Sequence, residues 1–153
     1  MNTDEYLEKL TEGLTGLTFQ QKLTVGIFFL RKQISAVAGF DKIYSEQLLP
    51  FYEEIINMLT VCANVGCDTS VLRNKLQHCS EKIPDTEEFT SEVGSFAQHA
   101  MISACYLLSF CLDQNPADFH KTLEMAVENF YIQNKLSDVL LSNDLPHELI
   151  LNV

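Results

Sequence analysis

The stretch TFQQKLTVGIFFLRKQISAVAG, residues 18–39, predicts one long helix that is apolar on almost every side. Apolar residues recur every three or four positions along one face of this helix, and others occupy much of its remaining surface. They are Leu23, Val25, Ile27, Phe28, Phe29, Leu30, Ile34 and Val37. Thr18 and Gln21 have the spacing of a capping box, which begins a helix, and Gly39 fits the position just after a helix end. A helix of this kind belongs at the centre of a helical bundle.

The same spacing of apolar residues continues on both sides of this stretch. The first predicted helix has Thr3 as its N-cap and ends at Gly13 or Gly16, and a second region of helix covers 42–65. Three more helices are predicted: from Asp68 or Thr69 to about residue 82, from about Ser95 to Leu112, and from Asn115 to Leu136. A short docking helix is predicted within 142–153. Pro50 predicts either a kink or a fresh helix start inside 42–65. Alternating runs of valine and isoleucine, which would indicate a sheet, do not occur. The sequence therefore predicts an all-α fold, a single-domain bundle of about six helices over residues 1–153.

Acidic residues are concentrated in the second half of the chain. The sequence holds 21 Asp and Glu against 10 Lys and Arg, a net charge of −11. Residues 1–40 are neutral, 41–80 carry −2, and 81–153 carry −9. Such a surface repels nucleic acid and anionic membranes and attracts basic proteins. We therefore expect a basic protein partner, with no nucleic-acid ligand and no membrane association.

The cysteine content and the apolar runs predict the compartment. Five cysteines, an odd number, and an acidic N-terminus unlike a secretory signal favour free thiols in the reducing cytoplasm. Cysteine is among the most buried residue types, so these thiols are expected in the core. The longest uncharged apolar run, between Glu92 and Asp113, contains Gln98 and His99 and predicts a buried helix rather than a membrane span.

Motifs for catalysis and metal binding do not occur in the sequence. The cysteine and histidine spacings do not match those of structural zinc sites, and no nucleophile elbow, phosphate loop or dinucleotide-binding glycine pattern is found. His99 in an apolar helix is more often a hydrogen-bonded core residue than a general base, although an enzyme built on His99 and a carboxylate is an alternative. We predict no enzymatic activity, no metal site and no cofactor.

The most acidic segment is EKIPDTEEFTSE, residues 81–92, with five acids and one base. It is either a solvated loop that leads into the next helix or a docking surface that imitates nucleic-acid phosphate for a basic partner. Phe89 within it is either an aromatic anchor for that partner or a side chain that pins the loop to the core. The predicted partner-binding residues are Asp85, Glu87, Glu88 and Glu92, followed by Asp113 and Asp118 at the next interhelical turn.

This segment resembles the YjaG-like family of bacterial helical proteins, whose function is uncharacterised. The similarity rests on Leu76, Ile83-Pro84, Glu87-Glu88-Phe89 and the apolar helix that follows, and more loosely on Gly39-Phe40, Ile43-Tyr44 and the helix over 48–59. It covers about residues 19–136, and the family's aromatic-proline stretch before the Gly-Phe element is absent here. The resemblance implies a helical regulatory or oligomeric binding module and carries over no catalytic residue.

In size, acidity and helical pattern the chain is also similar to the immunity proteins of contact-dependent growth inhibition. Many toxins of such systems are basic nucleases, because binding RNA or DNA requires Lys and Arg against phosphate. This similarity implies a protein that neutralises a basic toxin domain, a nuclease such as an RNase, by blocking its active site or substrate groove. A YjaG-like module with no toxin partner is the alternative.

Overall fold

A computed structural model describes residues 2–134 of the chain. Within that range the fold is all-α, as predicted, and no strand occurs. The described residues form seven helices: α1 (Thr3–Gly13), α2 (Phe19–Arg31), α3 (Ile34–Tyr44), α4 (Leu48–Asn64), α5 (Thr69–Glu81), α6 (Glu92–Asp113) and α7 (Pro116–Ile132). The expected helix within 142–153 and the predicted helix end at Leu136 lie outside the described residues.

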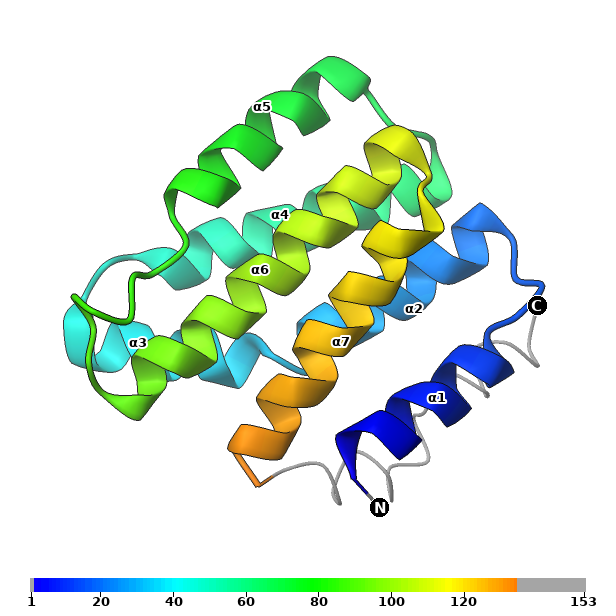
Figure 1. The fold of residues 1–153 in the computed structure, drawn as a ribbon. Helices are drawn as coiled ribbons and strands as arrows, with labels where there is room; N and C mark the ends of the chain where they lie inside the picture. Colours follow the sequence, from blue (N-terminus) through cyan, green and yellow to red (C-terminus); the bar gives the residue numbers. More distant parts are fainter. Residues whose placement is uncertain (1, 135–153) are drawn as a thin grey trace.

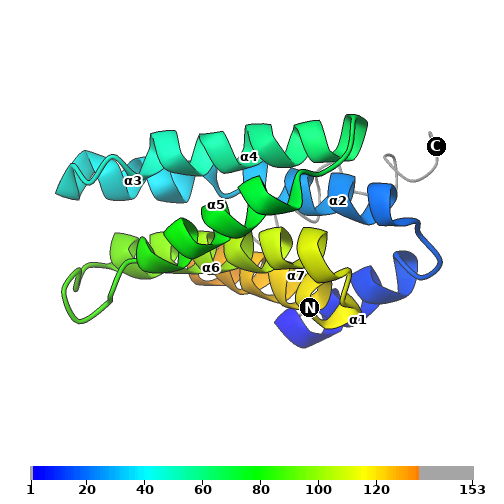
Figure 2. The same cartoon turned by 90° about the horizontal axis from the view of Figure 1, so that it is seen from above.

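The helices form two layers that enclose one apolar core. Figure 2 shows α2, α3 and α4 in one layer and α1, α6 and α7 in the other, with α5 running along one side between them. α6 is the most central helix, since it contacts α7, α5, α3, α2 and α4 (Figure 1). The largest fully buried side chains between the layers include Phe29, Phe40, Tyr52, Met101 and Phe130. Burial of each such side chain contributes about 1.5–3 kcal/mol, so this core accounts for the stability of the bundle.

The long helix predicted over residues 18–39 is two helices, and that prediction was wrong in this respect. α2 ends at Arg31 and α3 begins at Ile34, with Lys32 and Gln33 between them. The break turns the Gln33 amide into the core, where the side chain is fully buried. Gly39, predicted to follow a helix end, lies inside α3, which ends instead at Tyr44. The extra helix explains why the described residues hold seven helices where the sequence predicted about six.

Three helix starts with a local capping signal were predicted correctly. The Thr18 hydroxyl accepts from the Gln21 backbone N–H while the Gln21 side chain accepts from the Thr18 N–H, which completes the capping box. Asp68 caps α5, and Asn115 caps α7 with Pro116 in the first turn. Each cap satisfies backbone donors that the first turn of a helix leaves unpaired.

Three helix starts differ in detail from the sequence-based expectation. α1 is capped by Asn2, whose side chain accepts from the Glu5 N–H at 2.8 Å, and Thr3 is already helical. α4 begins afresh at Leu48 with Pro50 in its first turn, which decides between the two interpretations of that proline. α6 begins at Glu92, three residues earlier than expected.

Among residues 2–134, two helical stretches are long and apolar enough to cross a membrane, Phe19–Tyr44 and Glu92–Asp113. In each, 56% of the apolar window is buried inside the bundle, and the first is divided between α2 and α3. A core helix meets the same criteria as a membrane span, so these stretches are weak evidence for membrane insertion.

Candidate functional site

The acidic segment forms a loop, residues 82–91, that joins α5 to α6 at one end of the bundle (Figure 1). Asp85 organises its turn, because its side chain accepts from the Glu87 N–H at 2.9 Å and its carbonyl accepts from the N–H groups of Glu88 and Phe89. The side chains of Asp85, Glu87, Glu88 and, in the first turn of α6, Glu92 are exposed. We call residues 82–91 the acidic loop.

Phe89 fastens the acidic loop to the core. Its ring packs against Phe40 and Tyr44 of α3, with centroids 5.0 and 4.8 Å away and both pairs in edge-to-face geometry. Such aromatic pairs contribute about 0.5–1.5 kcal/mol each beyond the area that they bury. The Tyr44 hydroxyl also lies 2.7 Å from the Ser91 hydroxyl, within hydrogen-bond distance. This geometry supports the interpretation of Phe89 as a core contact rather than an exposed anchor.

Gly94, in the first turn of α6, lets the loop lie close to the helix. A Cβ atom at this position would stand 2.2 Å from the Phe89 carbonyl oxygen and 3.0 Å from the Phe89 Cβ. The Gln98 side chain adds a second attachment, since it donates to the Pro84 carbonyl at 3.2 Å. The acidic loop is therefore held near its start, at Pro84, and near its end, at Phe89 and Ser91.

A groove of about 420 Å³ opens beside the acidic loop. Its charged lining residues are four acids and one base, namely Glu46, Glu81, Asp85, Glu88 and Lys82, and its apolar ones are Phe40, Leu48, Ile83, Pro84 and Phe89. Glu46 carries no signal in the sequence that links it to this site, because it lies in the turn between α3 and α4, about 40 positions before the loop. Carboxylates from two distant segments thus converge on one groove, a surface suited to cationic side chains.

The six predicted partner-binding residues do not form one cluster. Asp85 and Glu88 line the groove, while Glu87 and Glu92 are exposed near it. Asp113 and Asp118 belong to the turn between α6 and α7, at the other end of the 22-residue α6, roughly 30 Å away (Figure 1).

Asp118 has a structural role at the far turn. Its carboxylate accepts from the Ser109 hydroxyl at 2.9 Å, which ties the start of α7 to α6. Burial, together with the neighbouring Asp113, raises the pKa of Asp118, although the Ser109 hydrogen bond opposes this shift. Of the six predicted residues, the structure therefore brings only Asp85 and Glu88 into the groove, and Asp113 and Asp118 serve a different part of the molecule.

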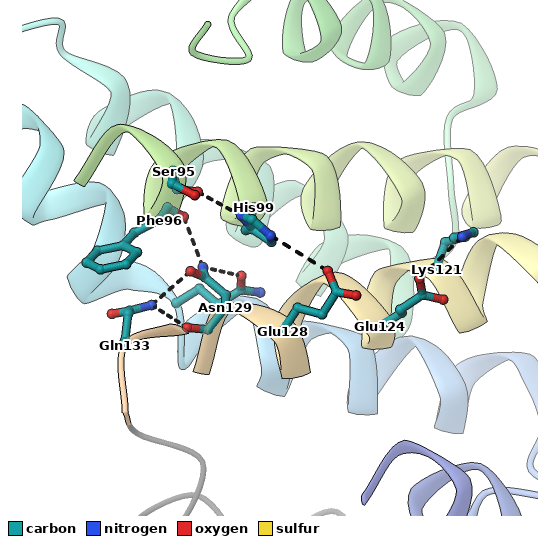
Figure 3. A network of polar contacts seen from close by, with 9 residues as sticks. Ser95, Phe96, His99, Lys121, Glu124, Glu128, Asn129 and Gln133 are labelled. Carbon is teal, nitrogen blue, oxygen red and sulfur yellow. Dashed lines mark hydrogen bonds and ion pairs between the residues drawn. The ribbon is translucent and has the colours of Figure 1, made fainter. Parts of the chain in front are cut away.

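A buried polar network crosses the core, and the sequence analysis missed it. Asn129 of α7 donates at 2.9 Å to both the Gln33 amide oxygen and the Phe96 carbonyl, and Gln133 donates to the Asn129 side chain (Figure 3). Gln33 in turn donates to the Ser103 hydroxyl at 3.2 Å. The network joins the α2–α3 break, α6 and α7 through donors and acceptors that are all satisfied, which a buried polar group requires.

The network continues as a reciprocal pair between α6 and α7. The Ser103 hydroxyl donates to the Thr122 carbonyl at 2.9 Å, and the Thr122 hydroxyl donates to the Ser103 carbonyl. Both side chains are fully buried. Small hydroxyl residues at this crossing let the two helices approach closely, and the pair fixes their axial position.

His99 lies on α6 at the edge of this network, next to a carboxylate of α7. Its Nδ1 is 2.8 Å from the Ser95 carbonyl, and its Nε2 is 3.7 Å from a Glu128 carboxylate oxygen (Figure 3). Both ring nitrogens face protein partners, which orient the imidazole as a bridge between α6 and α7. This arrangement fits the expected hydrogen-bonded core histidine better than a general base that faces a substrate.

All five cysteines are free thiols and gather in two groups. Cys62 and Cys111 are buried and both have the Cys67 sulfur as a neighbour; burial raises the pKa of Cys62 to about 12 and also raises that of Cys111. Cys79 and Cys105 form a separate pair between α5 and α6. Within residues 2–134, no three His, Cys, Asp or Glu side chains are placed to hold a metal ion.

Comparison with known proteins gives no relative. No protein-family model, no curated protein and no solved structure matches the chain. The resemblance to the YjaG-like family and the similarity to immunity proteins therefore stay predictions.

Proposed function

We propose that this protein is a cytoplasmic immunity protein that binds a basic toxin domain and neutralises it. The toxin would be a nuclease such as an RNase, and the bound protein would block its active site or substrate groove. No chemistry is performed by the immunity protein itself. The single observation that carries the proposal is the groove beside the acidic loop, where Glu46, Glu81, Asp85 and Glu88 converge with one base, Lys82.

The fixed geometry of the acidic loop supports this proposal. The contacts of Phe89, Ser91 and Gln98 hold the loop in place before any partner binds. A surface that is already ordered loses less conformational entropy on binding, so more of the interaction energy appears as affinity. A nuclease binds nucleic-acid phosphate through Lys and Arg side chains. At the groove, the carboxylates would take the place of the phosphates as the anionic partners of these side chains.

The net charge of −11 supports fast association. Opposite charges steer diffusional encounter and raise association rates by roughly 10- to 1,000-fold at low ionic strength. An immunity protein benefits from such speed, because a toxin molecule that stays free is harmful. Nuclease–immunity pairs are also among the tightest complexes of proteins.

Affinity capture tests whether a toxin partner exists. The full chain is used as bait in a lysate that also expresses the coding region immediately upstream, and bound proteins are identified by mass spectrometry at low and high salt. We expect stoichiometric capture of a basic nuclease domain, with more captured at low salt. Capture of no such domain at either salt would refute the proposal and leave the YjaG-like regulatory or oligomeric module as the alternative.

A charge-reversal pair then tests the site. In one variant Glu87→Lys and Glu88→Lys reverse two exposed acids of the acidic loop; in the control, Glu8→Lys and Glu12→Lys reverse two exposed acids of α1. Both variants change the net charge equally, so a difference between them reports position. We expect the loop variant to slow association with the captured toxin roughly 10-fold and to weaken its salt dependence, and the α1 variant to have a smaller effect. Equal effects would place the docking surface elsewhere.

A further inference from the structure

Cys79 of α5 and Cys105 of α6 lie in direct sulfur–sulfur contact. The two Sγ atoms are 2.9 Å apart, with Cys105 as the donor, and the Cys79 sulfur lies 3.7 Å from the Met101 carbonyl. The sulfurs of a disulfide are about 2.05 Å apart, so a bond between these two requires them to approach by roughly 0.9 Å. The proposed docking function does not use this pair.

The two thiols differ in access to solvent. Cys79 is fully buried, whereas Cys105 is half-buried on the outer side of the contact. The contact with the Cys105 sulfur, followed by burial, raises the pKa of Cys79 far above its ordinary value, although Lys75 opposes this shift. Cys79 lies behind Cys105, so an oxidant from solvent reaches Cys105 first.

We propose that Cys79 and Cys105 form an oxidation-sensitive pair that closes to a disulfide when the protein meets a peroxide. Cys105 reacts first: its sulfur takes one oxygen from hydrogen peroxide to give a sulfenic acid, and the other oxygen leaves as water. The Cys79 sulfur then attacks the Cys105 sulfur, the S–O bond breaks, and hydroxide leaves as a second water with the Cys79 proton. The two sulfurs lose two electrons in total, and the peroxide gains them.

The position of the pair gives the bond a consequence for the acidic loop. Cys79 lies in the last turn of α5 and Cys105 in the middle of α6, so the closed ring contains the whole loop over 82–91. A disulfide that closes a ring of this length removes much of the conformational freedom of the unfolded chain. We expect oxidation to raise the melting temperature by roughly 10 °C. Disulfides of cytosolic proteins, where they occur, are usually transient and catalytic or redox-sensing.

The test uses the full chain, first reduced and then freed of reductant. The protein is treated with equimolar hydrogen peroxide, remaining thiols are alkylated, and peptides are analysed by mass spectrometry without reduction. We expect a cross-linked peptide that joins Cys79 to Cys105, with two hydrogen atoms fewer than the reduced pair. Thermal unfolding followed by circular dichroism should show the higher melting temperature, and added reductant should reverse it.

Two variants make the test specific. Cys105→Ser removes the accessible sulfur of the pair, and Cys67→Ser removes the other half-buried sulfur as a matched control. We expect Cys105→Ser to abolish both the cross-link and the rise in melting temperature, and Cys67→Ser to leave both in place. Accumulation of Cys105 as sulfinic acid with no cross-link would overturn the proposal, as would a disulfide that forms among Cys62, Cys67 and Cys111 instead.

Discussion

Gly94→Ala tests whether the close contact between α6 and the acidic loop determines the stability of this end of the bundle. The added methyl group would meet the Phe89 carbonyl oxygen at 2.2 Å, about 1.2 Å short of an ordinary contact of 3.4 Å. The obstacle is backbone rather than the end of a flexible side chain, so a rotamer change does not relieve it. The loop must move outward, and with it the Phe89 ring that packs on Phe40 and Tyr44.

Two costs and one gain determine the expected change in the free energy of unfolding. Forcing an extra carbon into a well-packed site costs about 1–3 kcal/mol. Each of the two aromatic pairs contributes about 0.5–1.5 kcal/mol, and weakening them loses a fraction of that energy. Replacing a helical glycine by alanine gains only about 0.5–1 kcal/mol. We therefore expect Gly94→Ala to lower the free energy of unfolding by about 1–3 kcal/mol, and the melting temperature by roughly 3–10 °C.

Gly39→Ala is the matched control, because a Cβ atom at this helical position meets no heavy atom within 4 Å. It should raise the free energy of unfolding by about 0.5–1 kcal/mol. Urea titration followed by circular dichroism measures both variants, and equal slopes of the two transitions show that they unfold alike. If Gly94→Ala were as stable as Gly39→Ala, the close contact would not constrain the acidic loop, and the argument for a preordered docking surface would fail.

Three further substitutions test the core and the far turn. Asn129→Leu leaves the buried Gln33 amide oxygen without its donor and should lower the free energy of unfolding, measured by urea titration, by about 1–3 kcal/mol; a loss below about 1 kcal/mol would contradict the network. Burial and Asp113 raise the pKa of Asp118, so the folded protein loses stability as pH rises and this carboxyl ionises. Asp118→Asn does not ionise, so its free energy of unfolding should rise relative to that of the natural protein from about pH 4 to pH 7. A difference in the free energy of unfolding that stays constant with pH would refute this. The buried Tyr6 hydroxyl has no hydrogen-bond partner within residues 2–134. Tyr6→Phe should therefore leave the free energy of unfolding unchanged or raise it by up to about 1 kcal/mol. A decrease of more than about 1 kcal/mol would show that the hydroxyl has a partner.

The sequence predicted three helix starts whose signal is local and missed the helix break between α2 and α3, which has no local signal. Thr18, Asp68 and Asn115 cap their helices through side chains that act within three residues, so the pattern alone identifies them. The break between α2 and α3 has no such signal, because Lys32 and Gln33 are ordinary helix formers. Its cause lies in two hydrogen bonds of the Gln33 side chain, which donates to Ser103 and accepts from Asn129, 70 and 96 positions further along the chain.

The candidate site was predictable in part for the same reason. An acidic loop with exposed carboxylates can be read directly from residues 81–92. The convergence of Glu46 on the same groove depends on the packing of α3 against α6, and the separation of Asp113 from the loop depends on the length of α6. Proximity in space between distant segments is set by tertiary packing, which a single sequence does not state.

The buried polar network also determines which register of the helices is native. α6 presents Ala97, Ala100 and Ala104 to the core, a smooth face along which a neighbouring helix could slide by one turn with little loss of apolar contact. Such a slide would separate Ser103 from Thr122 and leave buried donors and acceptors unpaired, at about 1–3 kcal/mol for each group. Misregistered bundles would then be several kcal/mol less stable than the native one, so these few polar side chains select one structure among many that an alanine-rich interface would otherwise permit.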